Sequence, residues 1–424
     1  MSTAAKTLLD SERRTLHPSF FMFLIAPFGA TTGYTAVCLA YLLTQAQVGA
    51  ESVAGLLALA YLPQTWKFLW APVVDLSLSR KTWYVLGLVG IVLSMLLVGS
   101  SPLNAASMTR LTIWVLVMGT ASTFLAMAVD SLMAHQTPEH AKGRAAGWFQ
   151  AGNLGGGGLG GGAALWLIQS GGLSPQMGAA ALAGLCVLCA WPIFWVSEGS
   201  EPAAEQAADQ AEGATPARIG QRLRETWADL WSVVRSRNGA LAMLLVFLPL
   251  GTGSMANMYS IMATEWQASA NTVALVTGTV AGLLSALGCL IGGYVCDRMN
   301  RQMAYVIFGL LLAGASVAMA VAPHTEWHFV LWTSLYSLIT GLCYAGFSAV
   351  TLEAIGKGAA ATKYNLMASL SNTPIGWTTA LYGWVFAQFG GRLTLLAELA
   401  LTVPAALLFV WVFRRGRARA AAML

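Results

Sequence analysis

Charge is scarce in this 424-residue chain. Asp, Glu, Lys and Arg make up 10% of the sequence, whereas soluble globular domains carry about a quarter of such residues. Hydrophobic residues make up 57%, the mean hydropathy is +0.64, and the apolar residues fall in long blocks that largely exclude charge. This pattern excludes a soluble multidomain protein and indicates a chain that crosses a membrane many times.

Cysteine and histidine are also few. The six cysteines all fall in or beside apolar blocks, which argues against a disulfide framework. Cys186 and Cys189 have the spacing of a redox or metal pair, but no second pair accompanies them, so we interpret them as packing residues. The five histidines lie in connecting segments. We therefore expect no metal site, no cofactor and no enzyme embedded in the membrane.

The apolar blocks predict an all-α polytopic membrane protein. A transmembrane helix needs about 20 apolar residues. We count twelve such spans, of which the glycine-rich fifth is the weakest: 18–43, 52–72, 83–100, 109–134, 146–168, 177–197, 239–263, 271–295, 302–322, 328–352, 364–389 and 394–413.

The positions of lysine and arginine predict the orientation, because cytoplasmic loops carry an excess of both. With both termini cytoplasmic, 20 of the 23 fall in cytoplasmic segments, Arg110 and Arg392 fall outside, and Lys67 lies within a span. The net charge of +5 therefore reflects the orientation of the chain in the membrane and does not indicate a nucleic-acid partner. The partners we expect are the lipid bilayer and a small-molecule substrate, with the protein a monomer.

One long connection divides the chain into an N-terminal six-helix half (1–197), a cytoplasmic linker (198–237) and a C-terminal six-helix half (238–424). The first part of the linker is acidic and alanine-rich, as in a flexible linker. Its second part, 219–234, has apolar residues at helical spacing. It predicts an amphipathic helix on the membrane surface, with a partner-binding helix as the alternative.

The two halves repeat at an offset near 222 residues. Pro27-Phe28-Gly29 matches Pro249-Leu250-Gly251, Asp75 matches Asp297, and Asp130 matches Glu353. Each pair lies at the same place in its half. Two parallel six-helix repeats are the arrangement of major facilitator transporters, in which the substrate site lies between the halves near the bilayer midplane.

Two motifs carry a resemblance to that superfamily. The loop Gly293-Tyr-Val-Cys-Asp297-Arg298-Met-Asn-Arg301 resembles its signature loop, with the last Arg one position early. In the first-half copy, Ala71-Pro-Val-Val-Asp75, Ala replaces Gly, and Arg80 follows only later. The segment Leu62-Pro63-Gln-Thr-Trp66-Lys67-Phe-Leu-Trp70-Ala71-Pro72-Val-Val-Asp75 is similar to the second span of the anhydromuropeptide permease family, which also includes acetyl-CoA transporters and siderophore permeases.

Lys67 is the sharpest candidate for a functional residue. It lies eight residues before Asp75, so it is about 12 Å inside the cytoplasmic border. A cation at this depth costs about 2.5–3.5 kcal/mol on insertion scales and usually faces a cavity or a partner. We expect it to contact an anionic substrate or to form an ion pair. The alternative is a side chain that reaches back to the interface.

Two acids, Asp130 and Glu353, lie near the cytoplasmic ends of cavity-type spans. The resemblance implies a latch that closes the cytoplasmic side, in which such acids join the residues of the signature loops: Asp75, Arg80, Asp297, Arg298 and Arg301. Proton coupling is the alternative for Asp130 and Glu353, because a coupling carboxylate must be buried and must exchange partners. Glu398, in the last span, is expected to be interfacial and of little functional weight.

Further polar residues in the cavity-type spans are candidates for substrate binding, although buried amides also hold membrane helices together. They are Tyr34, Gln64, Gln150, Asn153, Asn257, Tyr259, Asn372 and Trp377. The glycine run at 152–162 lacks the ending of a phosphate-binding loop and lies within a span. Together with the glycines of the eighth span, it predicts close helix packing.

The function that these features favour is secondary active transport by alternating access, coupled to protons, in the inner membrane of a bacterium. The resemblance implies import of a bulky polar solute such as a muropeptide, with a ferric siderophore as the alternative. A drug or metabolite exporter of the same fold is the second alternative. A passive channel fits less well, because the repeat provides two halves that can rock against each other.

Overall fold

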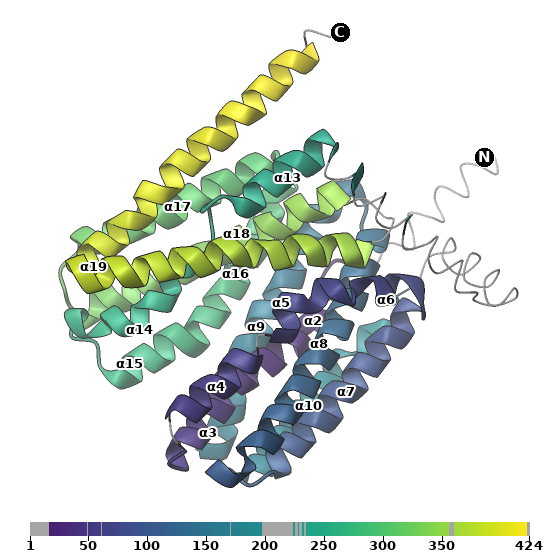
Figure 1. The fold of residues 1–424 in the computed structure, drawn as a ribbon, viewed down its shortest axis with the longest axis vertical. Helices are drawn as coiled ribbons and strands as arrows, with labels where there is room; N and C mark the ends of the chain where they lie inside the picture. The colour runs from purple at the N-terminus through teal and green to yellow at the C-terminus, as the bar shows by residue number, and fades with distance from the viewer. Residues whose placement is uncertain are drawn as a thin grey trace, which may run out of the picture.

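The fold is described by a computed structural model that covers residues 17–48, 50–60, 62–169, 171–196, 224, 228, 231–232, 235–355 and 360–421. Within these residues the regular secondary structure is helical, with no strand. The predicted amphipathic helix at 219–234 lies mostly outside the described residues. We call the helices before this gap the N-terminal group and those after it the C-terminal group (Figure 1).

The N-terminal group follows the first six predicted spans. Its first two spans are broken into short segments, and the others are long helices. The segments are α2 (Phe20–Gly33), the π-helix η1 (Tyr34–Leu39), α3 (Ala40–Gln45), α4 (Ala50–Ala60), α5 (Leu62–Trp66), the 3-10 turn η2 (Lys67–Leu69), α6 (Ala71–Leu76), α7 (Arg80–Ser100), η3 (Ala105–Ser107), α8 (Met108–Gln136), η4 (Glu139–Ala141), α9 (Lys142–Gln169), α10 (Pro175–Cys189) and η5 (Trp191–Phe194).

The C-terminal group follows the other six. Its segments are α13 (Arg237–Phe247), η6 (Ser254–Met258), α14 (Tyr259–Met262), η7 (Ala263–Trp266), α15 (Ala270–Ala274), η8 (Leu275–Val280), α16 (Ala281–Cys296), α17 (Arg301–Val321), α18 (Glu326–Ile355) and α19 (Ala360–Ala421). The last of these contains two spans, because its backbone leaves the helical region at Gly390, where φ is 77°.

Eight helical stretches of the described residues are long and apolar enough to cross a membrane. One of them, 362–415, covers the eleventh and twelfth predicted spans. The remaining three predicted spans are the glycine-rich α9 and the two interrupted stretches α4–α6 and α13–η7. Every predicted span therefore has a helical counterpart. The three that do not meet the length and hydropathy criteria are either rich in glycine or interrupted by a break in the helix.

Several helices begin at a residue that caps the free N–H groups of the first turn. Ser79 accepts a hydrogen bond from the backbone of Thr82 at the start of α7, and Asn300 does the same for Met303 at the start of α17. These are the residue types that stabilise helix starts, because their side-chain oxygens replace missing helical carbonyls. These two helices are the third spans of their groups.

The predicted repeat is visible in tertiary contacts. The hydroxyl of Tyr84 in α7 donates to the carbonyl of Leu24 in α2, at 3.2 Å. The hydroxyl of Tyr305 in α17 donates to the carbonyl of Leu250, next to α13, at 2.7 Å. The two tyrosines are 221 residues apart. In each group the third span is therefore tied to the first by the same kind of bond.

The glycine run of α9 allows close packing, as its sequence predicts. A Cβ atom on Gly29 or Gly33 of α2 would collide with the backbone of Asn153 or Gly157 in α9. On another side of α9, a Cβ on Gly282 would lie 2.9 Å from the Cα of Gly158. The backbone of α9 therefore touches both α2 of its own group and α16 of the C-terminal group.

The seventh span is broken. Helix α13 ends at Phe247 and helical structure resumes at Ser254. Between them, Gly251 and Gly253 have φ of 65° and 69°, a region that residues with a Cβ rarely adopt. The first span, by contrast, continues through Pro27. The sequence match of Pro27 to Pro249 did not predict this difference.

Candidate transport site

The two groups are joined by a carboxylate that caps a helix of the other group. Asp297, at the end of α16, accepts hydrogen bonds from the backbone N–H of Gly143 at 2.7 Å and of Arg144 at 3.0 Å. It also accepts one from the Arg144 guanidinium at 2.7 Å. The N-terminus of α9 carries a partial positive charge and unpaired donors, so the contact combines a cap with an ion pair.

A second contact lies at the same end of the molecule. Arg301 of α17 forms ion pairs with Glu139 across the groups, at 2.5 Å, and with Glu353 of α18, at 3.5 Å. Partial burial raises the pKa of Glu139, but hydrogen bonds and charge from Lys142 and Arg301 outweigh it. The net pKa of Glu139 is therefore held below its ordinary value.

Deeper in the interface, hydrogen bonds between polar side chains also connect the groups. Asn365 of α19 donates to Asp130 of α8 at 3.1 Å, and both are fully buried. Gln150 of α9 donates to Ser348 of α18 at 2.6 Å, and the Ser348 hydroxyl lies 2.7 Å from that of Tyr364. These bonds must break or exchange if the groups separate.

Lys67 points inward. Its side chain is 9% exposed, and its ammonium lies 5.9 Å from the ring centre of Phe28 in α2. Asp130 is the acid whose charge acts on it. The 3-10 turn η2 interrupts the second span at this residue. The ammonium therefore lies inside the protein, and the expected substrate contact or ion pair stays a prediction.

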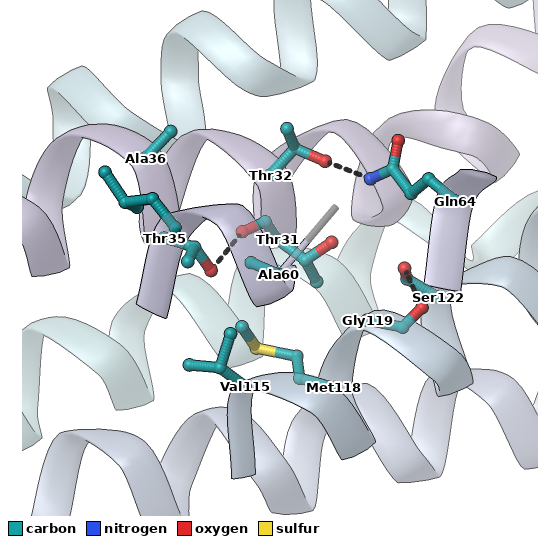
Figure 2. A pocket seen from close by; sticks show the side chains of 11 residues that line it. Thr31, Thr32, Thr35, Ala36, Ala60, Gln64, Val115, Met118, Gly119 and Ser122 are labelled. Atoms are coloured by element: carbon teal, nitrogen blue, oxygen red, sulfur yellow. Dashed lines mark hydrogen bonds between the residues drawn. The ribbon is translucent and has the colours of Figure 1, made fainter. Parts of the chain in front are cut away.

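A pocket lies among the first, second and fourth spans (Figure 2). It is lined by residues of α2, η1, α4, α5 and α8: Thr31, Thr32, Thr35, Ala36, Leu57, Ala60, Gln64, Val115, Met118, Gly119 and Ser122. Gln64 donates to the hydroxyl of Thr32 at 3.0 Å across the pocket. Of the predicted substrate residues, Gln64 is the one that lines this pocket.

The pocket hydroxyls already donate their protons to their own helices. Thr31 donates to the carbonyl of Phe28 at 2.8 Å, Thr35 to that of Thr31 at 2.9 Å, and Ser122 to that of Gly119 at 2.7 Å. A hydroxyl has two further acceptor positions once its proton is used. These groups therefore offer acceptors to a solute, and they suit one that donates hydrogen bonds.

The other predicted substrate residues are dispersed. Tyr34 and Tyr259 are buried, with 1% and 2% of their surface exposed. Asn153 donates to Gln150 at 3.0 Å within α9. In the C-terminal group, Asn257 donates to Thr379 at 3.0 Å, and Asn257, Asn372 and Trp377 are all exposed. No described contact gathers these residues at one point.

The predicted latch residues also separate into two sets. Asp297, Arg301 and Glu353 belong to the contacts described above, as does Asp130. Arg80 binds within its own group, to Ser131 at 2.8 Å and His135 at 3.1 Å. Arg298, in the turn after α16, lies over the ring of Tyr294 in that helix. Asp75 is part of α6, but its side chain lies outside the described part of the structure.

One expectation was wrong. Glu398 is not interfacial: 3% of its surface is exposed, and it is enclosed by α17, α18 and α19. Its position in the last span suggested an outer helix face. A single acid in an apolar stretch gives no sign of which way it points, so the sequence could not reveal that it turns inward.

Sequence reasoning also missed residues that form the site. Glu139, Gly143 and Arg144 form the other side of the contacts to Asp297 and Arg301, and Thr31, Thr32 and Ser122 line the pocket. For Arg144 the only signal was its positive charge, which the membrane topology already explained, and nothing in the sequence singled out Glu139 or Gly143. For the pocket, the signal was the spacing of Thr31, Thr32 and Thr35, which places them on neighbouring turns.

A family model described as Major Facilitator Superfamily matches residues 19–376. The chain therefore belongs to the Major Facilitator Superfamily, and it is a multi-pass membrane protein of a transporter family. It is 24% identical over 182 residues to the anhydromuropeptide permease of Escherichia coli strain K12, and the corresponding protein of Escherichia coli O157:H7 matches equally. The match covers 41% of this chain and only 37% of either relative.

Solved structures of the same fold cover nearly the whole chain at 16% identity, which shows the fold alone. The human organic anion transporter MFSD10 (TETRAN) has a TM-score of 0.66, with 94% of this chain and 99% of that chain covered. The proton:xylose symporter XylE has a TM-score of 0.65, with 93% of this chain and 95% of that chain covered. The transporter FucP, in its outward conformation, has a TM-score of 0.65, with 94% of this chain and 99% of that chain covered.

Proposed function

We propose that this protein is a proton-coupled secondary transporter. It imports a bulky polar solute by alternating access across the inner membrane of a bacterium, with both termini in the cytoplasm. The orientation rests on the lysines and arginines, which gather in the segments that this topology makes cytoplasmic. The contacts of Asp297 and Arg301 then lie at the cytoplasmic end, which is closed in this conformation.

The observation that carries the proposal is the kind of contact that closes this end. A carboxylate on a helix N-terminus and an arginine between two acids join the groups through polar atoms at helix ends. Such contacts can exchange for water when the end opens, whereas a continuous apolar core could not separate cheaply. Alternating access needs a closure of this exchangeable kind.

The solute class follows from the pocket and from Lys67. Threonine and serine oxygens with free acceptor positions suit a solute rich in hydroxyl and amide groups, as a sugar–peptide is. An inward-facing ammonium suits one that also carries a carboxylate. The partial likeness to an anhydromuropeptide permease supports the same class. We therefore favour a muropeptide over a ferric siderophore.

The test is uptake of labelled anhydromuropeptide into proteoliposomes, with and without an inward-directed proton gradient. We expect accumulation above equilibrium only with the gradient. No uptake under either condition would overturn the muropeptide assignment and make ferric siderophores the next substrates to test. Active accumulation in vesicles of inverted orientation alone would instead identify an exporter.

A further inference from the structure

The interior of the C-terminal group contains an acid that the contacts between the groups do not use. Glu398 lies eight residues after Gly390, the turn between the last two spans. At 1.5 Å per residue this is about 12 Å from the end of the molecule opposite the closed contacts. Its surface is 3% exposed, so the carboxyl is within the helix bundle.

Two hydroxyl groups hold this carboxyl. Tyr336 of α18 donates to Oε1 at 2.7 Å, and Ser316 of α17 donates to Oε2. These hydroxyls are the hydrogen-bonding partners of Glu398, and no cation is among the groups that act on it in the described part of the chain. Asp130, by comparison, is acted on by the ammonium of Lys67.

The titratable groups that face Glu398 are all neutral at physiological pH. They come from three of the neighbouring elements: Tyr259 from α14, Tyr336 and Cys343 from α18, and Tyr382 from α19. The fourth, α17, contributes Ser316, which does not titrate. The rings of Tyr259 and Tyr336 pack edge to face, with centres 5.3 Å apart. These rings exclude water from the carboxyl but supply no positive charge.

Hydroxyl groups connect the same cluster to the break in the seventh span. The hydroxyl of Tyr382 forms a hydrogen bond with Ser254, whereas its interaction with Glu398 is electrostatic. The Ser254 hydroxyl in turn accepts from Thr378 at 2.8 Å and lies 2.9 Å from that of Thr252. Thr252 is partly exposed and stands between Gly251 and Gly253, the two residues with positive φ. A polar path therefore leads from Glu398 to the unwound backbone.

We propose that Glu398, enclosed by Ser316, Tyr336, Tyr259 and Tyr382, is a proton-binding site and is protonated in this conformation. Burying an ionised carboxylate with no counter-charge is costly, and such a group binds a proton instead. Two donors reduce this cost but do not remove it. In the protonated acid the Oε2 hydroxyl donates to the Ser316 oxygen, and Tyr336 continues to donate to the carbonyl oxygen Oε1. The proton reaches the carboxyl, and leaves it, along the hydroxyl groups of Tyr382, Ser254 and Thr252.

The role of this site in coupling rests on the proposed function, but the site itself does not. In transport, loss of the proton leaves a carboxylate that needs a new arrangement of donors. The unwound segment at Gly251–Gly253 is the nearby backbone that can change to supply it. Asp130, with Lys67 and Asn365 as partners, serves closure between the groups instead.

Infrared difference spectroscopy of the full chain in lipid nanodiscs tests the site without any substrate. A protonated carboxyl has a carbonyl stretch that disappears when the proton is lost at high pH. We expect this band in the parent protein and in Glu326→Gln, which removes an acid at the surface, and its loss in Glu398→Gln. A band pattern in Glu398→Gln identical to that of the parent would overturn the proposal.

A second variant keeps the carboxyl and so does not depend on the folding of Glu398→Gln. In Tyr336→Phe the carbonyl of Glu398 loses a hydrogen-bond donor, so its band should remain and move to higher frequency. A band that keeps its frequency would show that it belongs to another acid.

Transport then separates the two proposals. Glu398→Gln should lose proton-driven accumulation and keep exchange of substrate down its gradient. Full proton-driven accumulation in Glu398→Gln would overturn the coupling role of Glu398. Absence of muropeptide uptake in the parent would count against the proposed substrate and would leave the infrared result intact.

Discussion

The ammonium of Lys67 lies inside the N-terminal group, over Phe28 and within range of the charge of Asp130. Neither charged group has free access to water, because 9% and 1% of their surfaces are exposed. The charge of Asp130 therefore offsets part of the cost of burying the ammonium, although burial has the larger effect on Lys67.

We predict that Lys67→Ala lowers thermal stability in detergent markedly, because breaking a buried charge pair costs about 3–5 kcal/mol. The double variant Lys67→Ala/Asp130→Asn should recover part of this loss, since no lone charge remains. Arg110→Ala, at an exposed position, is the control. A double variant no more stable than Lys67→Ala would contradict the interaction.

Sequence reasoning located Lys67 and Asp130 because a charge inside an apolar block is conspicuous. It failed for Glu398, which has the same signature, because the direction in which a side chain points depends on the packing of three helices. It also failed for Arg144 and Glu139. These lie among many loop charges, and only the folded structure shows which of them meet Asp297 and Arg301.

At the scale of the element, the N-terminus of α9 is held by a residue of α16. The side chain of Asp297 is 6% exposed and accepts from two backbone N–H groups and an arginine. That of Glu139 is 67% exposed, and exposed ion pairs contribute only about 0–1 kcal/mol. The cap should therefore stabilise the closed end more than the ion pair does.

We predict that Asp297→Ala lowers the ratio of closed to open molecules by about tenfold or more, because hydrogen bonds to a charged group contribute about 1.5–3 kcal/mol. Glu139→Gln should have a much smaller effect. Spin labels at Leu78 and Met299, two exposed positions in the loops that follow the second and eighth spans, report the distance. Equal effects of the two variants would refute this ranking.

The lowered pKa of Glu139 predicts a dependence on pH. The ionised carboxylate stabilises the closed end above its ordinary pKa of 4.5, and this contribution is lost as the pH falls through the lowered value. Acidification through that range should therefore separate labels at Leu78 and Met299, and Glu139→Gln should remove part of the change. An identical pH response in Glu139→Gln would assign the effect to other groups.

Glycine packing between α9 and α16 gives a prediction with a control in the same span. In Gly282→Ala the new methyl group would meet the backbone of Gly158 and Leu154, which cannot move aside easily. Overpacking of this kind costs about 1–3 kcal/mol, so both melting temperature and uptake rate should fall. Gly278→Ala, which meets nothing within 4 Å, should change neither. Equal behaviour of the two would exclude close packing as the cause.

At the scale of the whole molecule, the sequence predicted the repeat and the number of spans, because hydropathy and landmark spacing act over long distances. The structure adds what these patterns cannot contain: the unwinding at Gly251–Gly253, the 3-10 turn at Lys67 and the joining of the last two spans across Gly390. Each depends on local backbone geometry that an apolar run does not encode.

The central claim is that the two groups rock so that one end closes as the other opens. Spin–spin distances in nanodiscs test it most directly, in a variant without native cysteines. One label pair is at Leu78 and Met299, and another is at Pro102 and Pro323, exposed positions just after α7 and α17. We expect substrate at acidic pH to lengthen the first distance and shorten the second. If both distances stay fixed, or change in the same direction, the protein does not work by alternating access.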